Sequence, residues 1–225
     1  MLNFSGMRFP KEIILLCIRW YAAYPLSYRH LEEMMEERGV SVDHSTVNRW
    51  AIKFCPLLER IFRKHKRPVG GSWRIDETYI KVNGQWKYLY RAVDKEGKTV
   101  DFLLRAKRDQ AAATVFFKKA MRQNGEPEKV TMDKSGANKA AMDGLNAERK
   151  EAIEVRQIKY LNNIVEQDHR AVKRITKPMM GFKSFWSASS VLAGIELMHM
   201  IRKGQMMVAE GEELSFADQF YALAG

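Results

Sequence analysis

One stretch constrains the fold more than any other: residues 73–94, which read WRIDETYIKVNGQWKYLYRAVD. Its β-branched and aromatic residues predict strands at 73–82 and 85–93, and the Asn-Gly pair between them is the strongest short signal for a β-hairpin. Asp76 lies where the first strand is becoming apolar. Because a carboxylate that enters a sheet core is costly unless something pairs with it, this position requires a counter-charge.

Strands and helices alternate after the hairpin. We expect a third strand at 98–106, a helix at 109–125, a strand at 129–133, a helix at 138–151, a strand at 153–160, a helix at 162–175 and further helix towards the C-terminus. Three strands in a meander followed by this alternation predict an α/β fold with a mixed sheet. In that topology the first and fourth strands are neighbours.

The first part of the chain is predicted to be helical, with three short helices. Ser27 and Asp43 are expected N-caps, and Gly39 lies where the second helix should stop. The third helix carries its apolar residues on one face: Val47, Trp50, Ala51 and Phe54. Three helices with a tight turn before the third are typical of a helix-turn-helix unit, although an ordinary three-helix bundle has the same pattern.

The clearest cluster of helix and strand breakers runs from Pro68 to Ser72. We therefore expect a small all-α helix-turn-helix domain at 1–67, a linker at 68–72 and a larger domain at 73–225.

The charge balance points to a polyanionic partner. Lys and Arg outnumber Asp and Glu by 38 to 27, which gives a net charge of +11. Nucleic acid is the first candidate and an anionic membrane surface the second, while solubility alone also favours such a charge. The apolar runs are too short and too interrupted by charge to anchor the chain in a membrane. Cys17 and Cys55 form neither a disulfide framework nor a metal motif, so we expect a cytoplasmic protein.

Three carboxylates stand out by their place in the predicted fold: Asp76 in the first strand, Asp133 at the end of the fourth, and Glu166 early in a late helix. Each alone has an ordinary explanation as a turn, cap or solvated residue. If the first and fourth strands are neighbours, however, the three can converge, and their repulsion then requires cations. Hard divalent ions suit such oxygen sites, so we expect two Mg²⁺ ions, with Mn²⁺ equally suitable.

A pair of such ions about 4 Å apart activates a water or a 3′-hydroxyl for attack on a phosphodiester. We expect the remaining acids near these segments to be hairpin, cap and surface residues: Glu77, Asp94, Asp101, Asp109, Asp143 and Asp168.

Several motifs together resemble one family. They are residues 27–50, 75–94 (IDETYIKVNGQWKYLYRAVD), 131–141 (TMDKSGANKAA), 156–174 (RQIKYLNNIVEQDHRAVKR), 181–184 (GFKS) and 194–205 (GIELMHMIRKGQ). In these motifs the chain is similar, nearly end to end, to the bacterial insertion-sequence-six transposases. The resemblance implies a ribonuclease-H-like core whose two aspartates and one glutamate correspond to Asp76, Asp133 and Glu166. These residues would be both the catalytic groups and the metal ligands.

Basic residues surround this expected site. Lys173 follows Glu166 by nearly two helical turns, with His169 and Arg170 between them, and such a face can hold a DNA phosphate near the metals. A solvated charge pattern at i,i+4 spacing is the alternative. The resemblance favours DNA contact, because similar transposases carry a basic residue at this place.

We expect two further groups to contact DNA. The predicted reader helix carries candidates for reading base edges: His44, Ser45, Thr46, Asn48 and Arg49. The basic tail after it is expected to contact phosphates through Arg63, Lys64, Lys66 and Arg67.

The sequence thus favours a transposase that binds the terminal inverted repeats of an insertion sequence, cuts its 3′ ends and joins them to target double-stranded DNA. Holding two ends together implies a homodimer or larger assembly, and the resemblance suggests cointegrate formation in the nucleoid of a bacterium. The alternatives are a catalytically inactive, domesticated DNA-binding regulator and a structure-selective nuclease on the same core.

Overall fold

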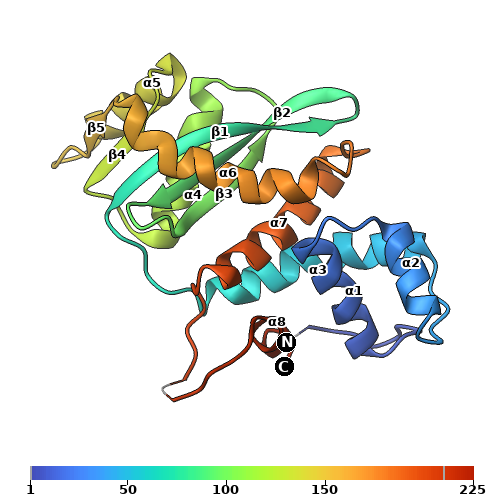
Figure 1. Ribbon diagram of the computed structural model, residues 1–225. Coiled ribbons are helices and arrows are strands. Elements are labelled where there is room, and N and C mark those ends of the chain that lie inside the picture. The colour runs from blue at the N-terminus through green and yellow to red at the C-terminus, as the bar shows by residue number, and fades with distance from the viewer. Residues whose placement is uncertain (1, 210) are drawn as a thin grey trace. The chain divides into compact units, whose positions relative to one another are not determined.

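The computed structural model describes residues 2–209 and 211–225. Along the chain the elements are α1 (Lys11–Ala23), α2 (Tyr28–Glu36), α3 (His44–Arg63), β1 (Ser72–Val82), β2 (Gln85–Asp94), β3 (Thr99–Arg105), α4 (Gln110–Asn124), β4 (Lys129–Met132), α5 (Gly136–Ala147), β5 (Glu154–Arg156), the 3₁₀ helix η1 (Lys159–Asn162), α6 (Asn163–Thr176), α7 (Phe185–Arg202) and α8 (Phe216–Ala222) (Figure 1). The predicted order of strands and helices is confirmed.

The chain divides into two compact units. A helical unit comprises Met1–Arg67 and Val172–Gly225, and a sheet unit comprises Pro68–Ala171. The break at Pro68 coincides with the expected linker, whereas the C-terminal helices group with the N-terminal ones. The predicted domains at 1–67 and 73–225 are segments expected to fold independently. The two compact units do not test independent folding, so this division stays a prediction.

The sheet unit is built on a mixed five-stranded sheet in the order β3-β2-β1-β4-β5. β1, β2 and β3 form an antiparallel meander, while β4 runs parallel to β1 and β5 runs parallel to β4. This confirms that the first and fourth strands are neighbours. α4 and α5 cover one face of the sheet, and the first part of α6 crosses the other (Figure 1). The arrangement is the one expected of a ribonuclease-H-like core.

The β1–β2 hairpin turns at Asn83 and Gly84, whose φ angles are +48° and +74°. Positive φ at both central residues defines the type I′ turn, whose twist matches that of the flanking strands. The turn sets the register in which Asp76 lies opposite Arg91 and Glu77 opposite Tyr90. One short sequence signal therefore fixes which residues share each face of the strands that carry the acids.

The core of the sheet unit lies between the sheet and helices α4 and α5. β1 and β2 contribute Trp73, Ile75, Tyr90 and Ala92, and the helices contribute rings and aliphatic groups that include Phe116. Because side chains alternate along a strand, this face holds the odd-numbered residues of β1. Glu77 belongs to that face, and Asp76 points to the opposite one, where α6 lies.

The fifth strand is shorter than predicted. β5 covers three residues, Glu154–Arg156, and the chain then enters η1 instead of continuing as strand to residue 160. The reason lies in its partner: β5 pairs only with β4, their register runs from Lys129↔Glu154 to Thr131↔Arg156, and β4 itself ends at Met132. The residues after Arg156 therefore have no β4 backbone beside them with which to form strand hydrogen bonds, and the strand ends there.

The helical unit is assembled around α7, most of whose residues from Ala188 to Ile201 are buried. It packs against α3 and α1. The expected caps are confirmed, because Ser27 accepts a hydrogen bond from the His30 backbone N–H and Asp43 accepts one from that of Ser45. Gly39 adopts a φ of +72° in the turn between α2 and α3. No helix in the described part of the chain is long and apolar enough to cross a membrane.

The contact of α7 with α3 at Gly194 provides a test of the packing. A Cβ atom at Gly194 would lie 2.5 Å from the Cys55 Sγ atom and 3.0 Å from its Cβ atom, whereas one at Gly144 in α5 meets nothing within 4 Å. We expect Gly194→Ala to lower the free energy of unfolding by about 1–3 kcal/mol, because overpacking outweighs the better helix propensity of Ala. Urea denaturation measures the change.

Gly144→Ala is the matched control and should be neutral or stabilising by up to about 1 kcal/mol. Cys55→Ala should relieve the effect of Gly194→Ala by removing the Sγ atom. If the Gly194→Ala protein and the unaltered protein have the same free energy of unfolding, α7 and α3 can move apart to admit the extra methyl group without loss of stability.

Candidate active site and nucleic-acid interface

The acidic site lies where β4 ends beside β1. The last paired residues of these parallel strands are Ile75 and Met132. Asp76 and Asp133 are the next residue of each chain segment, so the parallel pairing brings both to the same edge. From Asp76 onwards β1 pairs only with β2, which leaves room on its other side for the carboxylates.

Three acidic residues offer carboxylate oxygens that all lie within 4.8 Å of one another: Asp76, Glu77 and Asp133. The expectation that Glu77 is a hairpin or surface acid is therefore wrong, since its side chain is only 3% exposed and belongs to this cluster. Carboxylate oxygens suit Mg²⁺ and Mn²⁺, so the donor set fits a divalent ion. Glu166, in the first turn of α6, lies outside the 4.8 Å group of described residues.

The electrostatics of Asp76 reflect this crowding. The pKa of Asp76 is raised to about 7, mainly by burial and in smaller part by the charges of Glu77, Asp133 and Glu166, while a hydrogen bond from the Glu77 backbone opposes the rise. Glu166 is therefore close enough to Asp76 to repel it. The site concentrates negative charge that a bound cation would relieve.

Arg108, which belongs to none of the predicted site motifs, bridges two of the acids. Its Nη2 atom lies 3.0 Å from Glu77 Oε2 and 2.9 Å from Asp133 Oδ2. Asn138 donates a hydrogen bond of 2.9 Å to the other oxygen of Glu77. Burial raises the pKa of Glu77, while Arg108 and Asn138 lower it. The α4/α5 side of the site thus holds Glu77 and Asp133 in place with fixed donors.

On the opposite face, α6 contributes His169 and Asp168. The Nδ1 atom of His169 lies 3.7 Å from Asp76 Oδ2, and the side chain is buried. Asp168 forms an ion pair of 2.8 Å with Arg91, which is fully buried in β2. The expectation that Asp168 is a surface or cap acid is wrong, because its side chain is only 10% exposed and this pair ties α6 to the sheet.

The other expected DNA contacts of α6 lie at the surface. Arg170 and Lys173 are exposed. His169 differs from them because it is buried beside Asp76. That these three residues contact DNA stays a prediction.

The start of α3 carries an internally bonded polar group. Arg49 donates hydrogen bonds to Ser45 Oγ (3.1 Å) and Thr46 Oγ1 (2.6 Å), and its side chain is exposed. His44 lies 3.0 Å from Glu32. Hydrogen bonds from Ser45 and Thr46 hold the pKa of Asp43 well below its usual range, which keeps this cap ionised. Of the residues predicted to read bases, Ser45, Thr46 and Arg49 are thus held in one hydrogen-bonded group at the helix start.

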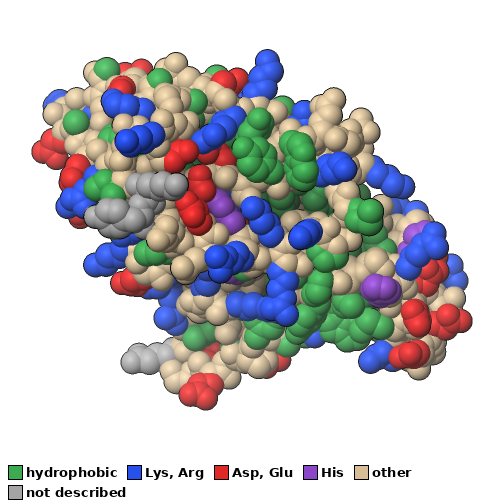
Figure 2. Space-filling view, turned by 45° about the horizontal axis from the view of Figure 1, so that its top comes forward, with side chains coloured by type: hydrophobic (Ala, Val, Ile, Leu, Met, Phe, Trp, Pro, Cys, Tyr) green, Lys and Arg blue, Asp and Glu red, His purple; other side chains and the backbone are tan. Residues whose placement is uncertain are grey.

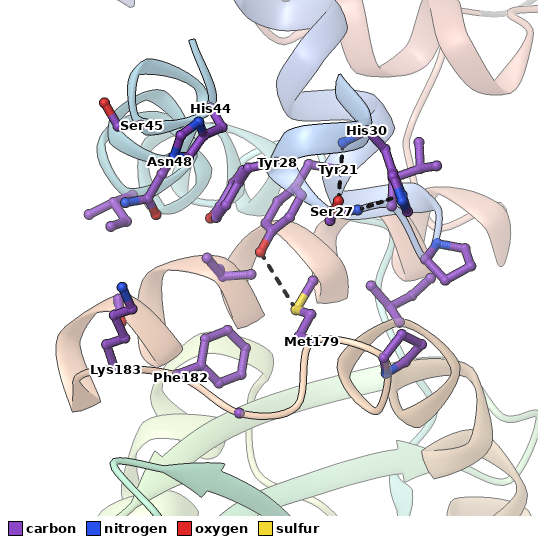
Figure 3. A pocket seen from close by; sticks show the side chains of 18 of the residues that line it. Tyr21, Ser27, Tyr28, His30, His44, Ser45, Asn48, Met179, Phe182 and Lys183 are labelled. Atoms are coloured by element: carbon purple, nitrogen blue, oxygen red, sulfur yellow. Dashed lines mark hydrogen bonds between the residues drawn. The ribbon is translucent and has the colours of Figure 1, made fainter. Parts of the chain in front are cut away.

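A pocket of about 620 Å³ lies beside this group in the helical unit (Figure 3). Asn48 and His44 lie on its α3 side, Tyr28 on its α2 side, and Phe182 and Lys183 line it from the loop before α7. The Tyr21 hydroxyl closes part of it through a contact with Met179 Sδ. The polar face of α3 therefore lines a pocket as well as facing solvent.

The basic run 63–67 is anchored to the C-terminal segment rather than free. The Arg67 backbone N–H donates to the Gln205 carbonyl (2.8 Å), and the Met207 N–H donates to the His65 carbonyl (2.7 Å). Arg63 pairs with Glu59, and Lys64 is exposed. Contact of this run with phosphates stays a prediction.

Lys and Arg side chains lie on many parts of the visible surface, and Asp and Glu side chains gather in smaller groups (Figure 2). On the face shown, the cationic side chains are therefore not confined to one element. Such a distribution suits a large polyanion better than a small anionic ligand.

The chain is similar to several known proteins. A family model described as a DDE domain matches residues 70–205. The chain is 41% identical over 206 residues to the transposase for insertion sequence-like element IS431mec of Staphylococcus aureus, covering 89% of this chain and 88% of that protein. It has the same identity and coverage with the transposase for insertion sequence element IS257 in transposon Tn4003, also of Staphylococcus aureus. The HTLV-2 integrase catalytic core domain in complex with magnesium is similar with a TM-score of 0.47 and 14% identity, covering 68% of this chain and 97% of that one.

The charge cluster predicts how the metal-free protein responds to pH. The pKa of Asp76 is about 7 in the folded chain, whereas an aspartate in an unfolded chain titrates near pH 4. Ionisation of Asp76 therefore opposes folding fully above about pH 7 and not at all below about pH 4. We expect Asp76→Asn to raise the free energy of unfolding by on the order of 1–3 kcal/mol near pH 8 and to change it little near pH 4.

Urea denaturation in the presence of a chelator at the two pH values measures this difference. Added Mg²⁺ or Mn²⁺ should stabilise the unaltered protein more than the Asp76→Asn protein. A loss of stability near pH 8 would mean that Asp76 is held by favourable partners, which contradicts the repulsion inferred from the geometry.

Proposed function

The chain belongs to the insertion-sequence-six family of DDE transposases, and from that premise we propose that Asp76, Asp133 and Glu166 are its catalytic carboxylates. The enzyme transfers phosphoryl groups on DNA. The observation that carries the assignment is the junction of β1 and β4, which brings Asp76 and Asp133 together and leaves Glu166 close enough to raise the pKa of Asp76.

We propose that these carboxylates hold two divalent ions, Mg²⁺ or Mn²⁺. The observed donor cluster supports this fit, with Glu77 as a further oxygen donor beside Asp76 and Asp133. When bound, such ions supply Lewis-acid activation of the attacking oxygen and stabilisation of the leaving oxygen.

The protein's own residues prepare the site. Arg108 and Asn138 fix the Glu77 and Asp133 carboxylates from one side, which limits the motion that repulsion would otherwise cause. His169 stands beside the Asp76 carboxylate on the other side, and the Arg91–Asp168 pair holds the helix that carries it. Preorganised ligands reduce the reorganisation needed when the substrate binds.

We propose that the reaction is cleavage at the 3′ ends of an insertion sequence followed by joining of the freed 3′-hydroxyls to target double-stranded DNA, with cointegrates as products. The α3 start would read the terminal inverted repeats through Ser45, Asn48 and Arg49. The exposed cations Lys64, Arg170 and Lys173 would hold phosphates. Two ends must be cut together, so a homodimer or larger assembly would act on the bacterial nucleoid.

A catalytically inactive DNA-binding regulator is the second candidate. The order of the α3 start supports DNA reading in either case. The acidic cluster argues for chemistry, because a regulator has no need for adjacent carboxylates that oppose folding.

The catalytic assignment predicts a clean separation of binding and chemistry. Asp76→Ala, Asp133→Ala and Glu166→Ala should each abolish 3′-end nicking and strand transfer on a duplex ending in the inverted repeat, while the affinity for that duplex stays nearly unchanged. A gel assay with Mg²⁺ resolves nicked and joined products. Asp143→Ala is the matched control, since Asp143 is an exposed acid that pairs with Lys139 on α5, and it should keep full activity.

Glu77→Gln tests the donor set in the same assay. Loss of activity would place Glu77 among the residues that hold or position the ions, and full activity would restrict the set to the other three acids. Binding without any joining by the unaltered protein would favour the regulator.

The reader helix generates a second prediction. If Arg49 touches a base, Arg49→Ala should weaken binding to the cognate inverted repeat by about 1–3 kcal/mol and leave binding to unrelated DNA unchanged. Fluorescence anisotropy with both duplexes at several salt concentrations measures this. An equal loss on all DNA, with a smaller salt dependence, would assign Arg49 to phosphate contact instead.

A further inference from the structure

One face of the β1–β2 hairpin leads directly away from the acidic site. Antiparallel pairing places Glu77 opposite Tyr90, Tyr79 opposite Tyr88, and Lys81 opposite Trp86. Directly opposed residues point to the same side of a sheet, and so do residues two apart along a strand. The face therefore runs from Glu77 at the acidic site to Trp86 at the hairpin tip. We call Tyr79, Lys81, Trp86 and Tyr88 the hairpin strip.

The hairpin strip is the part of this face that the core does not cover. Trp73 and Ile75 earlier on β1 are buried in the core, whereas Tyr79 is 52% exposed and Trp86 60% exposed. The residues of the opposite face at the same positions, Ile80 and Val82, are buried. A cluster of large exposed rings on one side of a strand whose other side is buried indicates an interaction site.

The rings are held in a defined cluster. The ring centroid of Tyr79 lies 5.5 Å from that of Tyr88 and 6.3 Å from that of Trp86, and the second pair is edge-to-face. Successive pairs along one face are about 7 Å apart, since a strand rises by about 3.4 Å per residue. The strip thus offers ring faces in steps that suit consecutive bases of an extended strand.

Cations flank the strip along its length. Lys81 is exposed at the tip opposite Trp86, and Arg105 of β3 pairs with Tyr88 in the sheet and lies on the same side. Arg108 stands at the end near Glu77. Rings alternating with cations are the pattern by which proteins bind unpaired nucleic acid, where the bases stack and the cations hold phosphates.

We propose that the hairpin strip binds an unpaired segment of the DNA strand next to the cleavage site. Paired bases stack on each other and expose only their edges, so a duplex has no ring face to offer Tyr79 and Trp86. A strand that is opened at the point of cutting does expose base faces. The strip lies on the same sheet face as Glu77 of the acidic cluster, where cutting is proposed, and starts one residue pair further along. This inference rests on the proposed function for the identity of the strand.

Binding of an oligothymidine of about twelve nucleotides to the full chain tests the strip without requiring catalysis. In fluorescence anisotropy without divalent ions, Trp86→Ala and Tyr79→Ala should each weaken binding of this single strand by about tenfold, and Trp86→Phe should restore most of the loss. Binding to a duplex of the same length should not change. An oligonucleotide carrying 5-iododeoxyuridine should crosslink on irradiation to the peptide that contains Tyr79 and Trp86.

A matched pair of lysines separates the strip from general charge. Lys81→Ala should weaken single-strand binding and lower its salt slope by about 1. Lys87→Ala should not, because Lys87 pairs with Ile80 and lies on the other side of the same hairpin. Thermal melting identifies any variant that does not fold, and Tyr79→Ala keeps the test decisive if Trp86→Ala fails to fold.

Equal single-strand affinity in the Trp86, Tyr79 and Lys87 variants, with no crosslink to the hairpin, would overturn the proposal. So would a change in oligomeric state measured by light scattering with unchanged single-strand affinity, which would make the strip a contact between copies of the chain. If the unaltered protein binds single strands through Trp86 but neither cuts nor joins ends, the strip stands and the proposed function fails.

Discussion

The repulsion among carboxylates at the end of β4 is the constraint on which the rest of the site depends. Parallel pairing of β1 and β4 stops at Ile75 and Met132, and the next residue on each side is an aspartate. Burial first, and charges of one sign second, raise the pKa of Asp76 at this junction, so its ionised form opposes folding. A fold retains such a junction only if the surrounding structure is rigid enough to tolerate it. The hairpin turn, the Arg91–Asp168 pair and the packed core provide that rigidity.

The neighbouring positions of Asp76 and Glu77 explain how two layers of the sheet unit reach one site. Successive residues of a strand point to opposite faces, so Asp76 faces α6 while Glu77 faces α4 and α5. His169 and Glu166 approach from the first side, and Arg108 and Asn138 approach from the second. The oxygens of the two acids still come close, because β4 ends there and leaves the edge of β1 open. The site is therefore located at a strand end and not on one face.

Local signals made the hairpin predictable, and topology made the meeting of Asp76 and Asp133 predictable. The Asn83-Gly84 turn needs only two residues with positive φ, and adjacent parallel strands bring their carboxyl ends together. Glu77 was misjudged because an acid next to a buried strand looks like a surface residue until its partners are known. Those partners, Arg108 and Asn138, are 31 and 61 positions away, and no spacing rule connects them to it. The short β5 was likewise missed because its length is set by the end of β4.

Arg108 neutralises the acidic site unevenly. Its guanidinium neutralises part of the charge on Glu77 and Asp133 and lowers the pKa of Glu77, which burial still keeps above its usual value. Asp76 has no comparable guanidinium among the described contacts, and its pKa is raised to about 7. A planar, fixed cation stabilises the two acids it touches without satisfying the whole cluster. Ions that enter the site would therefore find Asp133 already oriented and Asp76 still in need of positive charge. Because of this asymmetry, a bound divalent ion should favour the ionised form of Asp76 more than that of any other acid in the site.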